Sequence, residues 1–382
     1  MKIALVTETY PPEVNGVAMT LHRLVGGILS AGHVMQLVRP RQAVQVESSY
    51  FEGKLEELLV GSLPLPGYDG LRIGMPAMSR MKRLWKRSRP DVVHIATEGP
   101  LGAAALWVAR RMKIPVVSSF HTNFHSYGQH YGMGLLQDVG FAYLRTFHNY
   151  TAATFAPTRA ICEELGAQGI PHARVMSRGV DCELYQPAAR CETLRASWLG
   201  NATGPVVLYV GRIAQEKNLD CAVRGFYEIQ RSQPDARFVF VGDGPMRAEL
   251  EAAHPEFIFT GFQRGADLAK CYASADVFLF PSVTETFGNV LTEAMASGLA
   301  CVAYDYAAAR EYATEGVNAL LADKGDEDGF MAAAGRLAND ARLIEQLGDA
   351  ARELALQLSW GAVVRAYLAD TSAILQDAHP VV

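Results

Sequence analysis

The sequence lacks several features that would assign it at once to a familiar class of protein. It has no uninterrupted apolar run of the ~18 residues that a membrane-spanning helix needs. Its six cysteines are scattered between residues 162 and 301 without a C-x-x-C pair, which argues against a disulfide framework and a zinc site. The net charge is only -5, so no basic excess indicates a nucleic-acid partner.

A dinucleotide-binding fingerprint is also missing. Residues 11–17 contain Gly16, and residues 241–245 contain Gly242 and Gly244, but neither segment matches G-x-G-x-x-G. This counts against an enzyme that uses a nicotinamide cofactor. A simple turn is the default interpretation of residues 11–17, and a close approach of backbone to phosphate at Gly16 is the alternative.

The size and composition predict a folded protein with more than one domain. The chain has 382 residues, of which 49% are hydrophobic and 20% charged, so a large core can form. The apolar segment at residues 1–6 is too short for a signal peptide and predicts a first strand. We therefore expect a cytoplasmic protein, which a membrane surface can still attract.

Short apolar runs rich in Val, Ile and Phe alternate with longer helical patterns. Nearly continuous runs of this kind are typical of strands buried on both faces, so each half predicts a doubly wound parallel sheet. A segment with turn residues near 181–204 separates the halves, and residues 350–376 are helical in pattern. The predicted strands are residues 3–7, 34–38, 92–95, 116–119, 154–157, 206–210, 237–241, 257–260, 277–280 and 300–303.

The most informative motif covers residues 280–298. A strand ends at Phe280, a loop holds Glu285, and a helix over residues 289–297 contains Glu293 and stops at Gly298. In parallel sheets ligands bind at the carboxyl ends of the strands, and the first amides of the following helix can hold a phosphate. The two carboxylates would flank such a phosphate. An ordinary amphipathic helix with a solvated Glu at each end is the alternative.

A second motif places two cations after a predicted strand. Arg212 follows the strand at residues 206–210, and Lys217 lies five residues later. A planar guanidinium and an ammonium would stabilise the charge of a departing diphosphate. The alternative is a surface salt bridge with Glu216, and we favour the phosphate.

A third motif follows the strand at residues 116–119 and contains His121, His125 and His130. A metal cluster is disfavoured because no Cys or carboxylate completes a first shell and a loop gives no i, i+4 register. We interpret His121 as a hydrogen-bonding residue in a cleft, whereas His125 and His130 can equally be structural.

Residues 79–89 are strongly basic and carry Met81, Leu84 and Trp85 at helical spacing. Basic residues around a Trp can dock on anionic lipid headgroups. A solvated helix whose apolar side packs on the sheet explains the pattern equally well.

Together these motifs resemble glycosyltransferase family 4, retaining enzymes of the GT-B fold with two Rossmann-like domains facing across a cleft. The resemblance covers nearly the full length, and its most specific element is the E-x7-E motif of Glu285 and Glu293. Gly211-Arg212 with Glu216-Lys217-Asn218 resembles the family's phosphate-binding pair. Residues 119–124 resemble the histidine segment of members that glycosylate lipids, such as sulfoquinovosyl- and mannosyl-transferases.

The resemblance implies a role for each matching residue. Arg212 and Lys217 would bind the donor diphosphate, and Gly16 would approach the phosphate from the first domain. Glu285 would contact hydroxyls of the transferred sugar, and Glu293 would hold the ribose. The other implied contacts are His121 with the sugar and acceptor, Phe262 beside the base, and the backbone around Phe287, Gly288, Asn289, Val290 and Leu291 with phosphate or sugar oxygens.

The resemblance also assigns the domains. Residues 1–185, with a crossing helix at about residues 359–382, would bind the acceptor, and residues 186–358 would bind the nucleotide-sugar donor. No metal or other cofactor is implied, which fits the lack of a D-x-D-like motif in a suitable position. Transfer would be front-face: the acceptor attacks from the side that the nucleotide leaves, and the departing phosphate oxygen takes the proton.

The sequence leaves the donor and the acceptor open. GDP-mannose and a UDP-hexose are both candidate donors. We expect a lipid-linked acceptor, reached from the inner face of the cell membrane, and a soluble small molecule is the alternative. A nucleotide-sugar epimerase or phosphorylase of the same fold is the alternative enzyme. A catalytically idle nucleotide-sugar-binding subunit is the alternative from another class.

Overall fold

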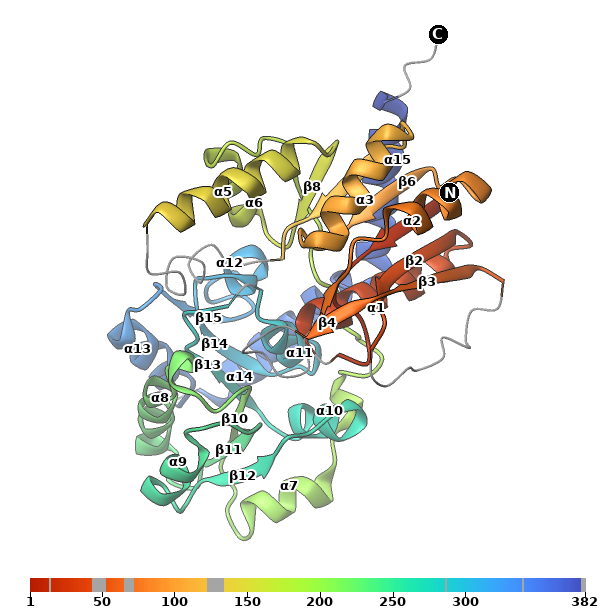
Figure 1. Ribbon diagram of the computed structural model, residues 1–382. Helices are drawn as coiled ribbons and strands as arrows, with labels where there is room; N and C mark the ends of the chain where they lie inside the picture. Colours follow the sequence, from red (N-terminus) through yellow and green to blue (C-terminus); the bar gives the residue numbers. More distant parts are fainter. Residues whose placement is uncertain are drawn as a thin grey trace. The chain divides into compact units, whose positions relative to one another are not determined.

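The computed structural model describes residues 1–13, 15–42, 53–64, 72–121, 134–285, 287–338 and 340–378. The chain divides into two compact units, which are described separately (Figure 1). Unit 1 comprises Met1–Arg178 and Trp360–Val382, and unit 2 comprises Gly179–Ser359.

Unit 1 contains a seven-stranded parallel sheet in the order β3-β2-β1-β6-β7-β8-β9. A short antiparallel pair, β4 and β5, follows β3. The strands of unit 1 are β1 (Lys2–Val6), β2 (Val34–Pro40), β3 (Leu55–Val60), β4 (Ser62–Pro64), β5 (Arg72–Gly74), β6 (Val92–Ile95), β7 (Val116–Ser119), β8 (Ala153–Ala156) and β9 (Ala173–Val175).

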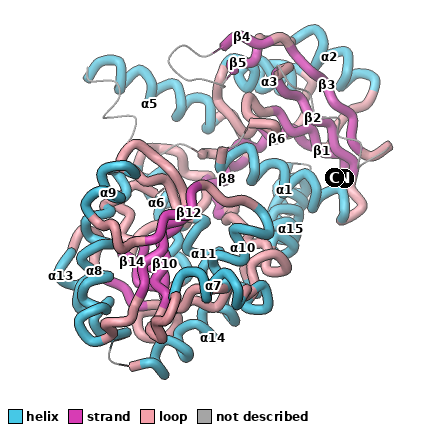
Figure 2. The backbone as a smooth tube through the Cα atoms, turned by 90° about the horizontal axis from the view of Figure 1, so that it is seen from below, coloured by secondary structure: helices cyan, strands magenta, loops and turns pink. Residues whose placement is uncertain are grey.

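Both faces of this sheet are covered by helices because alternate residues of each buried strand point to opposite sides. On β1, Ile3 and Leu5 pack with α1 and α15, whereas Ala4 and Val6 pack with α2 and α3. Figures 1 and 2 show α15, the last helix of the chain, beside α1. The helices of unit 1 are α1 (Gly16–Ser30), α2 (Met78–Arg87), α3 (Pro100–Arg111), α5 (Gly134–Asn149), α6 (Arg159–Ala167) and α15 (Trp360–Ala378).

Unit 2 contains a six-stranded parallel sheet in the order β12-β11-β10-β13-β14-β15. Its helices also divide between the two faces, with α8, α9 and α13 on one side and α7, α10, α11 and α14 on the other (Figure 2). The strands are β10 (Val206–Val210), β11 (Arg237–Val241), β12 (Ile258–Gly261), β13 (Val277–Phe280), β14 (Ala300–Tyr304) and β15 (Leu320–Ala322). The helices are α7 (Glu192–Leu199), α8 (Leu219–Ser232), α9 (Arg247–Ala253), α10 (Gly265–Ala273), α11 (Asn289–Ala296), α12 (Ala308–Tyr312), α13 (Glu327–Ala338) and α14 (Ala341–Gln357), with short 3-10 turns at Pro187–Ala189 and Gln215–Lys217.

The predicted doubly wound α/β architecture is confirmed. All ten predicted strands are present, five of them with the predicted bounds. The strands that the sequence did not predict include β3, β9 and β15, each at an edge of its sheet. The helical stretch predicted over residues 350–376 is interrupted at Leu358 and Ser359, where α14 ends and α15 has not yet begun.

Residues 179–185, which the sequence analysis placed in the first domain, group with unit 2. Val180 forms a parallel bridge with Ser359. The guanidinium of Arg352 on α14 donates to the carbonyl oxygens of Tyr185 (2.8 Å), Cys182 (3.1 Å) and Ala296 (2.6 Å). A composition-based boundary misses this because the anchor lies some 170 residues away along the chain.

The basic segment at residues 79–89 forms α2, and its apolar residues face the sheet. Met81, Leu84 and Trp85 are 0%, 6% and 0% exposed and belong to the core beneath α2 and α3. The apolar side of the helix thus packs on the sheet, and Trp85 cannot take part in docking on lipid headgroups because its ring is already buried. No helix within the described ranges combines the length and apolarity that crossing a bilayer requires.

The Arg352 contacts generate a stability prediction. Replacing Arg352 with Met removes the donor from three carbonyl groups and should lower the free energy of unfolding of unit 2 by about 2 kcal/mol. The matched control is Arg342→Met, on the exposed side of the same helix, which should change it by less than about 0.5 kcal/mol. Urea denaturation of both variants measures the difference, and equal stabilities would show that water replaces the guanidinium at no cost.

Candidate functional site

The carboxyl ends of β10 and β13 bring the two strongest sequence motifs of unit 2 together. These strands are neighbours in the parallel sheet, so the loops that follow them leave the same edge. Nζ of Lys217, which follows β10, lies 2.5 Å from Oε1 of Glu285, which follows β13. The sheet thus converts a separation of 68 residues into direct contact.

Glu285 is held by two donors, whereas Arg212 is largely in solvent. Ser282 Oγ donates to the same Glu285 oxygen at 2.7 Å, and both Lys217 and Glu285 are mostly buried. Arg212 pairs with Glu216 at 3.3 Å, the alternative that the sequence left open, but its side chain is 65% exposed. An ion pair at such exposure contributes little, so the guanidinium can exchange Glu216 for another anion at low cost.

The N-terminus of α11 presents polar groups that no described side chain caps. Gly288 precedes the helix with φ of +90°, a left-handed conformation that glycine adopts without strain, and no described side chain caps the helix. Oδ1 of Asn289 is buried and has no hydrogen-bond partner among the described residues. Uncapped amides at a helix start and a buried free acceptor suit a ligand that combines an anion with hydroxyl groups.

Glu293, one turn into α11, lies in an environment that disfavours its charge. Burial raises the pKa of its carboxyl group to about 7, and hydrogen bonds from Tyr272 and Tyr185 only partly oppose this effect. The Tyr272 hydroxyl donates to Oε2 at 3.0 Å. Near neutral pH the carboxyl is therefore poised between its two forms, and a ligand with hydroxyl donors would favour the ionised one.

Two glycine loops beside this region pack backbone against backbone. Gly242 has φ of +141°, and a Cβ there would lie 1.9 Å from the carbonyl oxygen of Gly211. A Cβ on Gly244 would lie 2.2 Å from the carbonyl oxygen of Ile213. The two glycines after β11 are thus required by close packing against the loop after β10, from which Arg212 projects.

Phe262 follows β12, two strands from β10, and is exposed. Its ring is 61% accessible, and the guanidinium of Arg264 lies 4.7 Å from the ring centre. Phe287, by contrast, is buried, and its carbonyl oxygen accepts from the amide of Ala308 at 2.8 Å. Val290 and Leu291 are in the first turn of α11, where Val290 is half-buried and Leu291 belongs to the core.

In unit 1, His121 follows β7 and lies near Arg178 and His94. Neither ring nitrogen has a hydrogen-bond partner among the residues that the structure describes. Burial, with smaller contributions from Arg178 and His94, lowers the pKa of His121 to about 3, so the ring is neutral at physiological pH. A neutral imidazole with both nitrogens unpaired can donate to one ligand group and accept from another.

Gly16 begins α1 and lies against Arg178. A Cβ on Gly16 would lie 3.1 Å from Nη1 of Arg178, which is 9% exposed, and Asn15 caps the helix by accepting from the amide of Ala18 at 2.8 Å. A guanidinium beside a helix N-terminus is a favourable place for an anion. Sequence analysis missed Arg178, because it follows β9, a three-residue strand too short to be predicted.

His94 is the other residue near His121 that the sequence analysis missed. Its Nε2 lies 2.6 Å from Ser119 Oγ and its Nδ1 lies 3.1 Å from the Tyr367 hydroxyl. His125 and His130 lie outside the described residues. Within the described part of the chain no three His, Cys, Asp or Glu side chains gather as a metal site would need.

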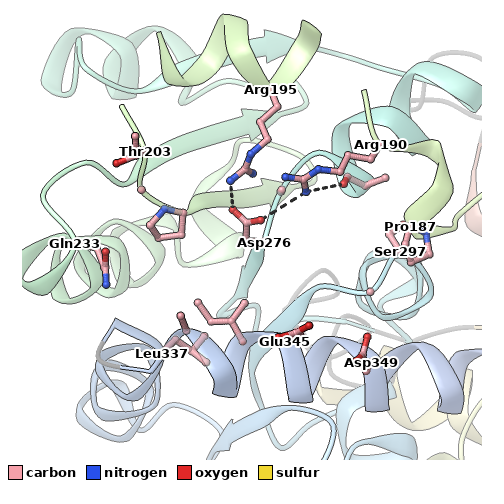
Figure 3. Close-up of a pocket in the computed structure, with 17 residues that line it drawn as sticks. Pro187, Arg190, Arg195, Thr203, Gln233, Asp276, Ser297, Leu337, Glu345 and Asp349 are labelled. Carbon is pink, nitrogen blue, oxygen red and sulfur yellow. Dashed lines mark hydrogen bonds and ion pairs between the residues drawn. The ribbon is translucent and has the colours of Figure 1, made fainter. Parts of the chain in front are cut away.

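A separate cavity of about 480 Å³ in unit 2 lies away from these residues (Figure 3). It borders Pro205 and Asp276, which immediately precede β10 and β13, so it is at the amino ends of the strands. Asp276 pairs there with Arg195 at 2.8 Å and Arg190 at 3.7 Å. This edge is opposite to the one where parallel sheets bind ligands.

The raised pKa of Glu293 generates a prediction about stability and pH. Because the pKa is raised on folding, the folded state binds more protons than the unfolded state between about pH 4.5 and 7, and stability falls as pH rises through that window. Glu293→Gln should remove this loss and raise the unfolding free energy at pH 8 by on the order of 2 kcal/mol. Urea titrations at pH 5 and pH 8 measure the change in unfolding free energy with pH. The control is Glu345→Gln, since Glu345 is an exposed carboxylate on α14. The same change with pH in wild type and Glu293→Gln would contradict the prediction.

Comparisons with known proteins now identify the family. A family model described as Glycosyltransferase Family 4 matches residues 14–184, and one described as Glycosyl transferases group 1 matches residues 204–340. The chain is 33% identical to a GDP-mannose-dependent alpha-mannosyltransferase of Mycolicibacterium smegmatis, over 98% of both chains. It is 32% identical to the sulfoquinovosyl transferase SQD2 of Arabidopsis thaliana, over 79% of this chain and 60% of the relative.

Solved structures confirm the fold. Anabaena HepE in complex with UDP matches with a TM-score of 0.75 at 18% identity, over 98% of this chain and 100% of the other. A sucrose-phosphate synthase of Thermosynechococcus elongatus matches with a TM-score of 0.74 at 18% identity, over 97% and 99% of the two chains. With the family motifs in both units and relatives matched over its full length, the chain belongs to glycosyltransferase family 4 and is a retaining hexosyltransferase of the GT-B fold.

Proposed function

We propose that this enzyme transfers mannose from GDP-mannose to an acceptor hydroxyl, with retention of configuration. The observation that carries the proposal is the likeness to relatives named GDP-mannose-dependent alpha-mannosyltransferases, which extends over 98% of this chain at 32–33% identity in three species. A UDP-hexose remains the alternative donor.

Lys217 and Arg212 bind the donor diphosphate in this proposal. Both cations follow β10, next to the uncapped start of α11, so two charges and a helix N-terminus converge on one place. A diphosphate gains negative charge as the bond to the sugar breaks, and fixed cations stabilise that change. Lys217 exchanges its contact with Glu285 for the phosphate, which frees Glu285 to accept from hydroxyls of the mannose.

The nucleoside extends from the diphosphate toward β12. Glu293 accepts from the ribose hydroxyls, which compensates the ionisation that its surroundings oppose. Phe262 is two strand spacings from β10, about 10 Å, and its exposed ring offers a stacking surface for the base. Asn289 Oδ1 accepts one of the remaining hydroxyl groups.

The chemical step needs no protein nucleophile. The bond between the sugar and the diphosphate breaks, the acceptor oxygen bonds to the same face of the sugar, and the departing phosphate oxygen takes the acceptor's proton. Within unit 1, neutral His121 can hydrogen-bond the hydroxyl groups of an acceptor, and Arg178 with the start of α1 offers positive charge to an anionic group.

Donor binding provides the direct test. GDP-mannose at about 100 times its Kd should add ~2.7 kcal/mol of stability in a thermal-shift assay, whereas UDP-glucose and UDP-galactose at the same concentration should add far less. Lys217→Ala should cut transfer by orders of magnitude without unfolding the protein, because it removes a cation from a developing charge.

Lys270→Ala is the matched control, because Lys270 is an exposed cation on α10, and this variant should behave as wild type. A larger shift with a UDP-hexose would replace the proposed donor. Normal turnover of Lys217→Ala would remove the phosphate assignment, and release of an isomerised nucleotide sugar in the absence of any acceptor would favour the epimerase.

We further propose that the acceptor is lipid-linked and that unit 1 reaches it from a membrane surface. The support lies on α2 and α3, whose C-terminal ends are tied together by Arg89, which donates to the carbonyl oxygens of Met112 and Lys113 at 2.9 and 2.8 Å. Trp107 on α3 is 47% exposed with Arg111 over its ring at 4.1 Å, so an aromatic anchor is present although Trp85 is not one. The exposed basic residues of this surface are Arg80, Lys82, Arg83, Lys86, Arg87, Arg89, Arg110, Arg111 and Lys113.

Liposome flotation tests this surface. At about 1 kcal/mol for each cation near an anionic surface, the enzyme should float with anionic vesicles at low salt, dissociate as salt screens the charges, and ignore neutral vesicles. Replacing Lys82, Arg83, Lys86 and Arg87 with Ser should abolish flotation, and Trp107→Ser should weaken it. If the enzyme does not float and efficiently glycosylates a soluble sugar, the lipid-linked acceptor is wrong and the basic side of α2 is simply solvated.

A further inference from the structure

A cavity of about 500 Å³ in unit 1 is lined by three arginines and by no carboxylate among the described residues. It lies where β2 and β3 end, at the carboxyl edge of the sheet, and the β4–β5 pair and the first turn of α2 complete it. Its described lining residues are Arg41, Gln42, Leu59, Gly61, Ser62, Arg72 and Arg80.

The three arginines are not neutralised within the described part of the chain. Every ion pair between described residues involves a different cation, so none of Arg41, Arg72 and Arg80 has a described carboxylate within 4.0 Å. Three like charges around one cavity repel one another, and an anion bound between them would relieve the repulsion. Guanidinium groups are the side chains best suited to bind phosphate or carboxylate through paired hydrogen bonds.

Ser62 fixes part of this arrangement. Its hydroxyl donates to the carbonyl oxygen of Arg41 at 2.7 Å and accepts from Nε of Arg72 at 2.7 Å. Arg72 Nη2 also donates to the Ser62 carbonyl oxygen at 3.2 Å. The guanidinium of Arg72 is therefore held before any ligand arrives, which lowers the entropy that binding costs.

Gln42 adds a second, independent feature. It is 8% exposed, its Nε2 donates to the Tyr10 carbonyl oxygen at 2.9 Å and to Glu13 Oε1 at 3.0 Å, and its Oε1 has no partner among the described residues. Because Nε2 is used in both bonds, the amide cannot be turned round, and Oε1 remains a buried acceptor. A buried acceptor beside cations suits a ligand that carries a hydroxyl near its anionic group.

The cavity lies in the same part of unit 1 as Gly16 and Arg178, which connects it with the proposed glycosyl transfer. Gly16 and its neighbour Arg178 lie where β1 is followed by α1, and Arg41 and Ser62 follow β2 and β3, the next strands in the sheet. The two places are also connected by hydrogen bonds. Gln42 donates to Glu13, which accepts from Thr9, and Thr9 accepts from Asn15, the residue before Gly16.

From these observations we infer that the cavity binds an acidic group, phosphate or carboxylate, on the hydroxyl-bearing head of the acceptor. This inference rests on the proposed function for the identity of the ligand as acceptor, but not for anion binding itself. The enzyme would then select acidic acceptors over neutral ones through Arg41, Arg72 and Arg80, with Gln42 contacting an adjacent hydroxyl.

Ligand-observed NMR titration of the whole enzyme tests anion binding without transfer. At constant ionic strength, glycerol 3-phosphate and glucuronate should bind, glycerol and glucose should not, and methyl phosphate, which lacks the hydroxyls, should bind more weakly than glycerol 3-phosphate. Arg41→Gln and Arg72→Gln should each weaken binding about tenfold or more, as loss of a charged hydrogen bond does. Arg365→Gln is the matched control, because Arg365 is an exposed arginine on α15 of the same unit, and this variant should leave binding unchanged.

Equal binding of glycerol and glycerol 3-phosphate, or full binding by Arg41→Gln and Arg72→Gln, would overturn the inference. The relative affinities of glycerol 3-phosphate and glucuronate distinguish a phosphate from a carboxylate as the preferred group. Ser62→Ala provides a milder variant that should weaken binding while preserving the charges, in case an arginine variant fails to fold.

A kinetic arm separates this inference from the proposed function. In neutral detergent micelles, where no charged surface attracts the enzyme, Arg72→Gln should raise the KM for an acidic glycolipid and leave the KM for GDP-mannose unchanged. An unchanged acceptor KM would overturn the acceptor assignment. If GDP-mannose supports no transfer at all, the proposed function fails, and the NMR result still decides whether the cavity binds anions.

Discussion

The contact between Lys217 and Glu285 depends on one constraint, the parallel pairing of β10 with β13. Parallel neighbours end at the same edge of a sheet, so residues far apart in sequence meet there and the site needs no long loop to assemble it. The pairing in turn requires two central strands that are apolar on both faces, and those of unit 2 are buried from end to end. Polar and charged groups are thereby confined to the strand ends, because a buried strand has no place for an unpaired charge.

The same constraint explains how the site tolerates its charges before a ligand binds. Lys217 and Glu285 neutralise each other, Arg212 remains in solvent, and Glu293 takes up a proton more readily than an ordinary carboxylic acid. In the proposed function a donor supplies what each group lacks: phosphate for the cations and hydroxyl donors for the carboxylates. Each buried charge thus has a partner both before and after the donor binds, which limits the free energy that binding costs.

The sequence predicted the central strands because their apolar runs are continuous, and it predicted the family because the motifs lie directly after those strands. It did not predict β9 and β15, which have three residues each, or β3, whose adjacent Glu56 and Glu57 and half-buried edge position obscure the pattern. The partners of the candidate site were also missed: Tyr272 and Tyr185 around Glu293, and Arg178 and His94 near His121. These contacts join separate elements of the fold, so no local pattern marks them. For Trp85 the local pattern was available but ambiguous. Its basic neighbours suggested an exposed side chain, whereas its helical register places the ring in the core.

In unit 1, as in unit 2, neighbouring parallel strands end at the same edge of the sheet and bring functional residues together there. Successive strands β1, β2 and β3 deliver Gly16, Arg41 and Ser62 to one edge, and Arg178 and Arg72 add positive charge beside them. In the proposed function, two separate cationic places would hold two different anionic groups, the acidic group of an acceptor at the cavity and a phosphate at Gly16 and Arg178. A single anion site would let the two ligands compete, whereas two sites at a fixed spacing allow both to bind and leave the acceptor hydroxyl free to react.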